Sequence, residues 1–179
     1  MGIEDGPKFN REIEQSESEP RFNSIQFDSS HFGEAEKSVD TNEVVGELNG
    51  WWKKICVENK IDPDDRRFKN IDYFIIELGK NALEHADGGE IKVLFENDKI
   101  TVIVTDRGQG FENPNDDILY GVPGHGLSEV KRYADEFIIE TNGKKFTKVP
   151  KKKKLVSSED TDVQSGTRIT FIKKFELSK

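Results

Sequence analysis

The sequence places a carboxylate and a carboxamide four residues apart, at Glu77 and Asn81. Both lie in a stretch whose apolar residues recur at steps of three and four, so the two side chains share one face of a predicted helix. The Asn81 carbonyl oxygen suits Mg²⁺, a hard cation that keeps waters and phosphate oxygens as its other ligands. Glu77 could orient or deprotonate an attacking group. For this pair taken alone, a solvated helix edge is the favoured alternative.

A second polar group, Asp106-Arg107-Gly108-Gln109-Gly110, directly follows a predicted strand. Apolar and polar residues alternate along that strand, and Asp106 continues the apolar phase, so its carboxylate points to the same face. Such a carboxylate can accept a hydrogen bond from an exocyclic amine such as that of adenine. Gly108 and Gly110 would let the backbone approach a flat ring. An ordinary strand-to-loop turn is the alternative.

A third group is rich in glycine and leads into a predicted helix, from Gly121 to Leu127. Glycines at a helix start expose backbone N–H groups, and the helix dipole favours an anion there. We therefore expect a triphosphate to contact Gly124, His125, Gly126 and Leu127. The sequence G-x-x-x-x-G-K-[ST] is absent from the chain, so this is not a Walker loop. A flexible loop with a helix cap is the alternative.

The fourth group is Ser165-Gly166-Thr167, at the start of the last predicted strand. Thr167 shares a face with the apolar residues Ile169 and Phe171, so its hydroxyl should point toward the same pocket. Without the other three groups, it would be a plain threonine at a strand start.

The elements that must position these groups are expected at residues 21–28 (strand), 41–58 (helix), from Asp62-Pro63 to Gly88-Gly89 (helix), 91–95 and 100–104 (hairpin), 125–134 (helix), and 137–140 and 167–171 (strands). This order predicts an α+β fold, a two-layer α/β sandwich whose sheet is mixed but mostly antiparallel, with helices on one face. Residues 21–179 are expected to form a single domain. Residues 1–20 are acidic and poor in apolar groups, so we expect a disordered tail.

Composition narrows the class of protein. The 179 residues include 27 Lys plus Arg and 35 Asp plus Glu, for a net charge of -8, which disfavours direct binding to nucleic acid or an anionic membrane. The single cysteine, Cys56, cannot form an internal disulfide. No apolar run suggests a secretory signal or a membrane span, so we expect a cytoplasmic location.

Together the four groups resemble, in order and spacing, the N, G1, G2 and G3 boxes of the GHKL ATPases, which share the Bergerat fold. The resemblance implies that ATP and Mg²⁺ are the cofactors. It implies Glu77 as the general base, Asn81 as the Mg²⁺ ligand and Asp106 as the adenine-reading aspartate. It further implies loop, phosphate and adenine-supporting roles for Gly108, Gly110, Gly124, Gly126 and Thr167.

Within that superfamily, the stretch from Glu77 to Ala86 is most similar to the small anti-sigma factor serine/threonine kinases. This implies an ATP-dependent protein kinase that regulates transcription by switching between an anti-sigma antagonist and a sigma factor. Two alternatives stay open: a non-catalytic, ATP-gated protein-binding module, and a stand-alone histidine-kinase-like ATPase with another partner. A homodimer is also open. The acidic N-terminal extension and the excursion at 142–164 are longer than that branch usually has.

Three further features lie outside the four groups. Lys144 to Lys154 contains seven lysines, which could contact an acidic partner or nucleic acid, although a solvated loop is favoured. Trp51 and Trp52 cannot both face inward on a helix, so one could mark a partner surface or be covered by the loop after Gly143. The stretch 107–124 holds glycines and prolines and is expected to be a lid over ATP.

Overall fold

The computed structural model describes residues 22–28, 41–68, 70–115 and 126–175. The expected tail at 1–20 lies outside these residues. So do two of the predicted phosphate-binding residues, Gly124 and His125, and residues 116–124 of the expected lid.

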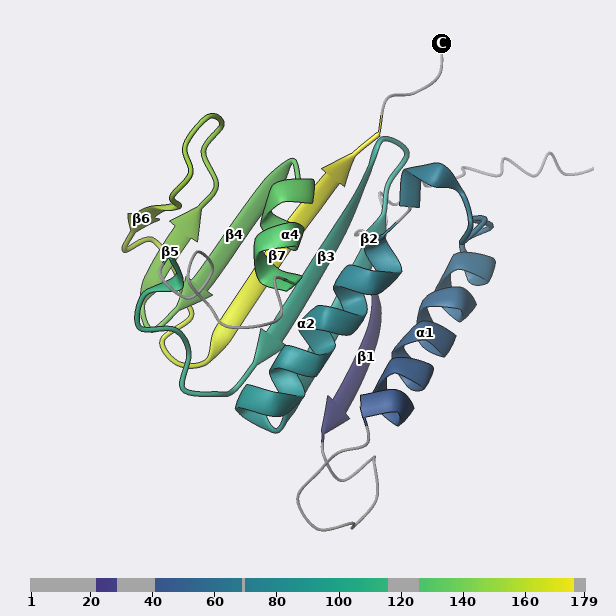
Figure 1. The fold of residues 1–179 in the computed structure, drawn as a ribbon, viewed down its shortest axis with the longest axis horizontal. Coiled ribbons are helices and arrows are strands. Elements are labelled where there is room, and N and C mark those ends of the chain that lie inside the picture. The colour runs from purple at the N-terminus through teal and green to yellow at the C-terminus, as the bar shows by residue number, and fades with distance from the viewer. Residues whose placement is uncertain (1–21, 29–40, 69, 116–125, 176–179) are drawn as a thin grey trace, which may run out of the picture.

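One sheet of seven strands runs through the described chain, in the order β1-β2-β3-β7-β4-β5-β6 (Figure 1). The strands are β1 (Asn23–Asp28), β2 (Gly88–Phe95), β3 (Lys99–Asp106), β4 (Glu136–Thr141), β5 (Lys144–Thr147), β6 (Val156–Ser158) and β7 (Thr167–Lys174). Every described pair of neighbours is antiparallel, whereas the sequence predicted a mixed sheet.

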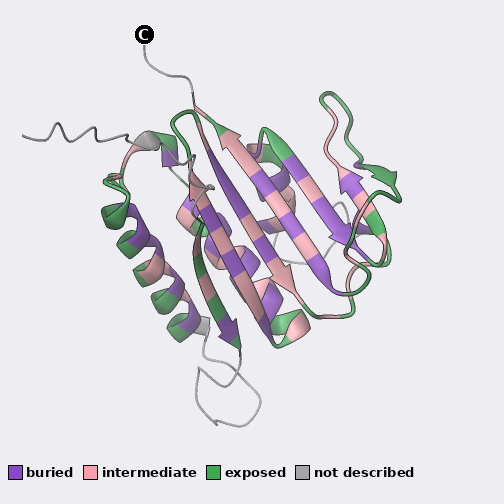
Figure 2. Cartoon of the chain, turned by 180° about the vertical axis from the view of Figure 1, so that it is seen from behind, coloured by how far each residue is buried: buried purple, intermediate pink, exposed green. Residues whose placement is uncertain are grey.

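The helices are α1 (Thr41–Glu58), α2 (Ile71–Ala86) and α4 (Gly126–Tyr133), with a short 3-10 helix η2 (Arg66–Phe68) before α2. They lie on one face of the sheet: in the view from behind, the strands lie in front of α2 and α4, and α1 is seen beside β1 (Figure 2). The expected two-layer α+β arrangement is therefore confirmed.

The core lies between the sheet and α2. The apolar stripe of α2 is buried, including Ile75 at 0% exposure and Leu78 at 2%. It meets strand residues such as Ile91, Val102 and Phe171, all at 0%. Full burial of one such side chain contributes about 1.5–3 kcal/mol, so this interface fixes α2 firmly above the sheet.

The predicted start of α2 at Asp62-Pro63 is wrong. The Asp62 carboxylate instead accepts a hydrogen bond from the Asp64 backbone N–H at 3.0 Å, which closes a turn. Asn70 then adopts a left-handed conformation, with φ of 75°. A residue in that region cannot continue a right-handed helix, so α2 begins only at Ile71.

Strands β5 and β6 were not predicted within the excursion at 142–164. Asn142 (φ 49°) and Gly143 (φ 73°) form a two-residue connection between β4 and β5, and Thr141 pairs with Lys144 across it. Two positive φ values in succession are the mark of a type I′ turn, which Asn-Gly favours. The dipeptide was therefore an available hairpin signal.

Within the described residues, no helix is long and apolar enough to cross a membrane.

Candidate functional site

Three adjacent strands have a terminus at the same end of the sheet. Asp106, the last residue of β3, pairs with Thr167 of β7, and Thr167 pairs in turn with Thr141 of β4. Thr167 is 3% exposed and Thr141 only 1%. Antiparallel pairing thus collects two hydroxyls and a carboxylate from distant parts of the sequence into one row.

Asp106 is held by several donors. Its Oδ1 accepts a hydrogen bond from the Gly108 backbone N–H at 2.9 Å, and Thr167 donates from both its backbone and its hydroxyl. Burial raises the pKa of the Asp106 carboxyl above its ordinary value, while these hydrogen bonds and nearby His85 act in the opposite direction. The result is a half-buried acceptor with a fixed orientation.

Gly108 lies against the C-terminal end of α2. A Cβ at this position would come within 2.8 Å of the Ala86 Cβ and 2.9 Å of the His85 carbonyl oxygen. Only glycine lets the chain pass so close. The first glycine of the predicted adenine loop therefore joins the sheet end to α2.

The chain after Gly108 is fastened to β4 and β7. The Thr141 hydroxyl donates to the Gly166 carbonyl oxygen at 2.9 Å and accepts from the Phe111 backbone N–H at 3.0 Å. Asn142 donates to the Gln109 carbonyl oxygen at 3.1 Å. Gly110 has φ of 74°, and a Cβ there would collide with the Thr141 hydroxyl. This end of the site is consequently a closed hydrogen-bonded unit.

The middle of α2 meets the start of α4. A Cβ built on Gly126 would lie 2.7 Å from Oε2 of Glu77, so this carboxylate sits directly against the first residue of the helix. Its other oxygen lies 3.4 Å from Nζ of Lys80. A carboxylate is well placed at the positive end of a helix dipole.

Lysines hold the other end of α4. Lys148 donates to the Ala134 carbonyl oxygen just after the helix, and Lys173 donates to that of Tyr133 at 3.3 Å. Cations are favoured at the negative end of the dipole. Burial lowers the pKa of Lys148, while the carboxylate of Asp135 raises it. These contacts fix the direction in which α4 presents its N-terminus to Glu77.

The predicted residues thus fall at two places along α2. Asp106, Gly108, Gly110 and Thr167 gather at its C-terminal end, and Glu77 and Gly126 meet at its middle. Eight residues separate Glu77 from His85, a distance of about 12 Å along a helix. Half-buried Asn81 lies one turn from Glu77, on the side of Gly108.

Leu127 is half-buried and packs against the core, so its described contact is apolar. In the described part of the chain, no group of three or more His, Cys, Asp or Glu side chains could hold a metal ion. Asn81, a carboxamide, is outside those residue types and could give Mg²⁺ one oxygen ligand.

Thr141 and Asn142 are the site residues that sequence reasoning missed. Their partners Gly166, Phe111 and Gln109 are 25 to 33 positions away in sequence, so no local pattern reveals the contacts. The Asn-Gly turn was the one signal that could have placed Thr141 at a strand end beside Thr167.

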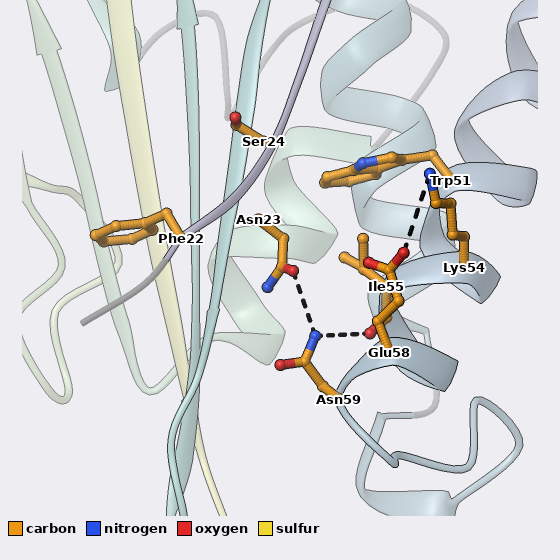
Figure 3. Close-up of a pocket in the computed structure, with 8 residues that line it drawn as sticks. All are labelled: Phe22, Asn23, Ser24, Trp51, Lys54, Ile55, Glu58 and Asn59. Carbon is orange, nitrogen blue, oxygen red and sulfur yellow. Dashed lines mark hydrogen bonds and ion pairs between the residues drawn. The ribbon is translucent and has the colours of Figure 1, made fainter. Parts of the chain in front are cut away.

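A cavity of about 530 Å³ lies elsewhere, between β1 and α1 (Figure 3). Trp51 is half-buried at this cavity, whereas Trp52 is 2% exposed and part of the core. The loop after Gly143 follows β4, near the opposite edge of the sheet, so it does not cover Trp51. The lining residues are Phe22, Asn23, Ser24, Trp51, Lys54, Ile55, Glu58 and Asn59, none of which belongs to the candidate site.

No known protein-family profile matches the chain, and a search of curated proteins found no significant match.

Proposed function

We propose that this protein binds ATP with Mg²⁺ between α2 and the segment that follows β3, as the GHKL ATPases it resembles do. One observation carries the proposal. Two glycines approach the same helix at points about 12 Å apart: Gly108, where a Cβ would meet the His85 carbonyl oxygen and the Ala86 Cβ, and Gly126, which lies against the Glu77 carboxylate. That spacing is on the scale of an extended nucleoside triphosphate.

The adenine would bind at the sheet end. Asp106 would accept a hydrogen bond from the exocyclic amine, with its carboxylate already oriented by Gly108 and Thr167. The Gly108 backbone would lie against the ring. Because its donors are in place before the ligand arrives, little conformational entropy is lost on binding.

The phosphates would bind where Glu77 meets Gly126. Backbone N–H groups at the start of α4 are suited to an anion. Asn81 would hold Mg²⁺, which when bound neutralises charge on the phosphate oxygens. Glu77 would accept the proton of an attacking hydroxyl, and its contact with Gly126 at the start of α4 supports this role.

The activity we propose is that of an anti-sigma-factor-type serine/threonine protein kinase acting in the cytoplasm as a partner-switching regulator. The acceptor would be an anti-sigma antagonist, and the sequestered partner a sigma factor. The similarity of the stretch from Glu77 to Ala86 to that branch supports this choice. The second candidate is a binding module in which ATP stabilises one conformation without transfer.

Isothermal titration calorimetry with ATP and Mg²⁺ tests the nucleotide site. Asp106→Asn should weaken ATP binding by about 1–3 kcal/mol, the cost of a lost hydrogen bond to a charged group. Asn81→Ala should abolish the gain in affinity that Mg²⁺ provides. Asn59→Ala, at the separate cavity beside β1, is the matched control and should change neither quantity. Unchanged affinity in both site variants would refute the assignment.

Glu77→Ala separates the two candidate functions. A kinase should lose phosphoryl transfer from radiolabelled ATP in this variant while it keeps ATP binding. A conformational module should show no transfer to any acceptor even in the wild type, although it binds ATP with the same dependence on Asp106.

A further inference from the structure

Four consecutive lysines, Lys151–Lys154, form an exposed cationic loop between β5 and β6. None of the four ammonium groups forms an ion pair with a carboxylate of the described residues. By contrast, six lysines elsewhere in the described chain each have a carboxylate within 4.0 Å: Lys54, Lys80, Lys92, Lys99, Lys173 and Lys174. The loop is therefore a local concentration of unpaired positive charge on an acidic protein of net charge -8.

The backbone of this loop is anchored at both ends. The Lys148 backbone N–H donates to the Phe137 carbonyl oxygen of β4 at 2.8 Å, and the Lys153 carbonyl oxygen accepts from Nζ of buried Lys131 on α4. Asn115 then bonds both backbone groups of Leu155, accepting from its N–H at 2.6 Å and donating to its carbonyl oxygen at 3.1 Å.

Because of these anchors, the four lysines stand on a fixed backbone. Leu155 is 4% exposed, so the chain enters the core immediately after the fourth lysine. The loop projects beyond β5 and β6, and its outer part is coloured as exposed (Figures 1 and 2). A charged surface on a fixed backbone binds at a smaller ordering cost than the same residues on a freely moving chain.

We propose that Lys151–Lys154 are a docking surface for a carboxylate-rich segment of a protein partner. The unpaired positive charges of the four lysines favour a negatively charged partner. Neighbouring exposed acids, Glu159 and Asp160, would repel any polyanion long enough to reach them, so the matching acidic segment is short. The described loop also offers no aromatic side chain on which bases could stack.

The surface also has an apolar component. Val156 follows the anchored Leu155 and is 41% exposed, one of few large apolar residues exposed in the described chain. The matching partner segment combines several glutamates or aspartates with an apolar residue that can contact Val156.

The anchors connect this surface to the nucleotide site, and this step rests on the proposed function. Lys131 belongs to α4, whose first residue meets Glu77, and Asn115 belongs to the segment that follows Asp106. A nucleotide that shifts either element would move an anchor of the lysine loop. Docking and ATP binding would then be thermodynamically linked, each changing the affinity of the other by the same factor.

Fluorescence anisotropy tests the docking surface with a labelled peptide probe in which glutamate alternates with serine around one leucine. The full chain should bind the probe, and combined Lys151→Ala, Lys152→Ala and Lys154→Ala should weaken binding about tenfold, since each exposed ion pair contributes modestly. The matched control removes the same charge from exposed positions near the end of α1, through Lys53→Ala, Lys54→Ala and Lys60→Ala, and should bind normally. Added salt should weaken binding to the wild type.

Three outcomes would overturn the proposal. The first is equal loss in the two triple variants, because net charge alone would then explain binding. The second is an oligothymidylate that binds as tightly as the peptide through the same lysines, which would make the surface a nucleic-acid site. The third is tighter probe binding after removal of residues 1–20, because the acidic N-terminal segment of this chain would then be the occupant.

The linkage is tested by the same titration with and without ATP and Mg²⁺. A changed probe affinity in the wild type, abolished by Asn115→Ala, supports it. Unchanged probe affinity in a protein that calorimetry shows to bind ATP overturns the linkage. Absence of ATP binding refutes the proposed function instead, so the two failures are distinguishable.

Discussion

The two ends of the candidate site differ in how they are held. At the sheet end, Asp106, Thr141 and Thr167 are tied together by hydrogen bonds across three strands and the following loop. At the other end, Glu77 is held by its packing against Gly126 and an ion pair of 3.4 Å with Lys80. The first end is a closed network, whereas the second rests on a contact between two helices.

This difference indicates that the two ends of the site along α2 have different roles in binding. A closed network recognises a flat, polar group without rearrangement. A contact between a side chain and a helix end can adjust when another anion arrives, because no buried hydrogen bond must first be broken. Substitutions at the sheet end should therefore act mainly on folding stability, and those at Glu77 mainly on function.

The largest expected loss of stability is at Gly166, inside the hydrogen-bonded network at the sheet end. Gly166→Ala would place a Cβ against the Asp106 carbonyl oxygen at φ of 73°, and should lower the free energy of unfolding by about 3 kcal/mol, since strain and a backbone collision add. Gly143→Ala is the matched control. It has the same φ, but the nearest atom is 3.6 Å away, so only the left-handed conformation costs energy, about 1 kcal/mol.

Urea unfolding followed by circular dichroism measures both variants. Equal losses would mean that the turn conformation dominates and that the close approach of Gly166 to β3 contributes nothing.

A smaller effect is expected from the Thr141 hydroxyl. Thr141→Val keeps the shape but leaves the Phe111 N–H and the Gly166 carbonyl without this partner, and should cost about 2 kcal/mol of unfolding free energy. Thr141→Ser should restore most of it. Thr170→Val, on the uncovered face of the sheet, should change stability by under about 0.5 kcal/mol. If Thr141→Val unfolds at the same urea concentration as the wild type, the network is not what holds this end.

Much of the fold was predictable because its signals are local. The apolar spacing placed α1 at 41–58 correctly, and alternation placed the strands that became β2 and β3. The start of α2 was not predictable in the same way. Asp62-Pro63 is a strong helix signal, yet Asn70 interrupts the chain in a left-handed conformation that no periodicity indicates.

Prediction of the site from the sequence has the same limit. The phase of β3 predicted where Asp106 points, and the structure pairs it with Thr167. Thr141 was missed because its role depends on β4 lying beside β7, and that neighbour relation is a property of the sheet order. Residues that act through tertiary hydrogen bonds carry no sequence pattern of their own.

The pH dependence of stability should distinguish two carboxyls, Asp106 on β3 and Glu140 on β4. Burial raises the pKa of Asp106 above 3.8, so its stabilising contribution is fully present below pH 3.8 and is lost as pH rises through the folded value. The hydrogen bond from Arg168 lowers the pKa of Glu140 below 4.5, so its contribution is present above pH 4.5 and is lost as pH falls through the folded value.

Unfolding free energies measured across acidic pH test this pair. The stability of the wild type relative to Asp106→Asn should fall as pH rises, and that relative to Glu140→Gln should fall as pH decreases. Slopes of the same sign would contradict the opposite environments of the two groups.

The smallest expected change in stability is at Glu77. The side chains of Glu77 and Lys80 are 18% and 26% exposed, and a partly solvated ion pair contributes at most about 1 kcal/mol, so Glu77→Gln should unfold almost as the wild type does. Its effect on ligand binding should be the opposite of that at Asp106. Removing a negative charge beside the start of α4 should strengthen ATP binding a few-fold, because the phosphates no longer meet a like charge. Calorimetry and urea unfolding on the same samples, with Glu84→Gln on the exposed side of α2 as control, measure both quantities. If Glu77→Gln costs several kcal/mol of stability, the contact with Gly126 is as fixed as the sheet end, and the site has no adjustable half.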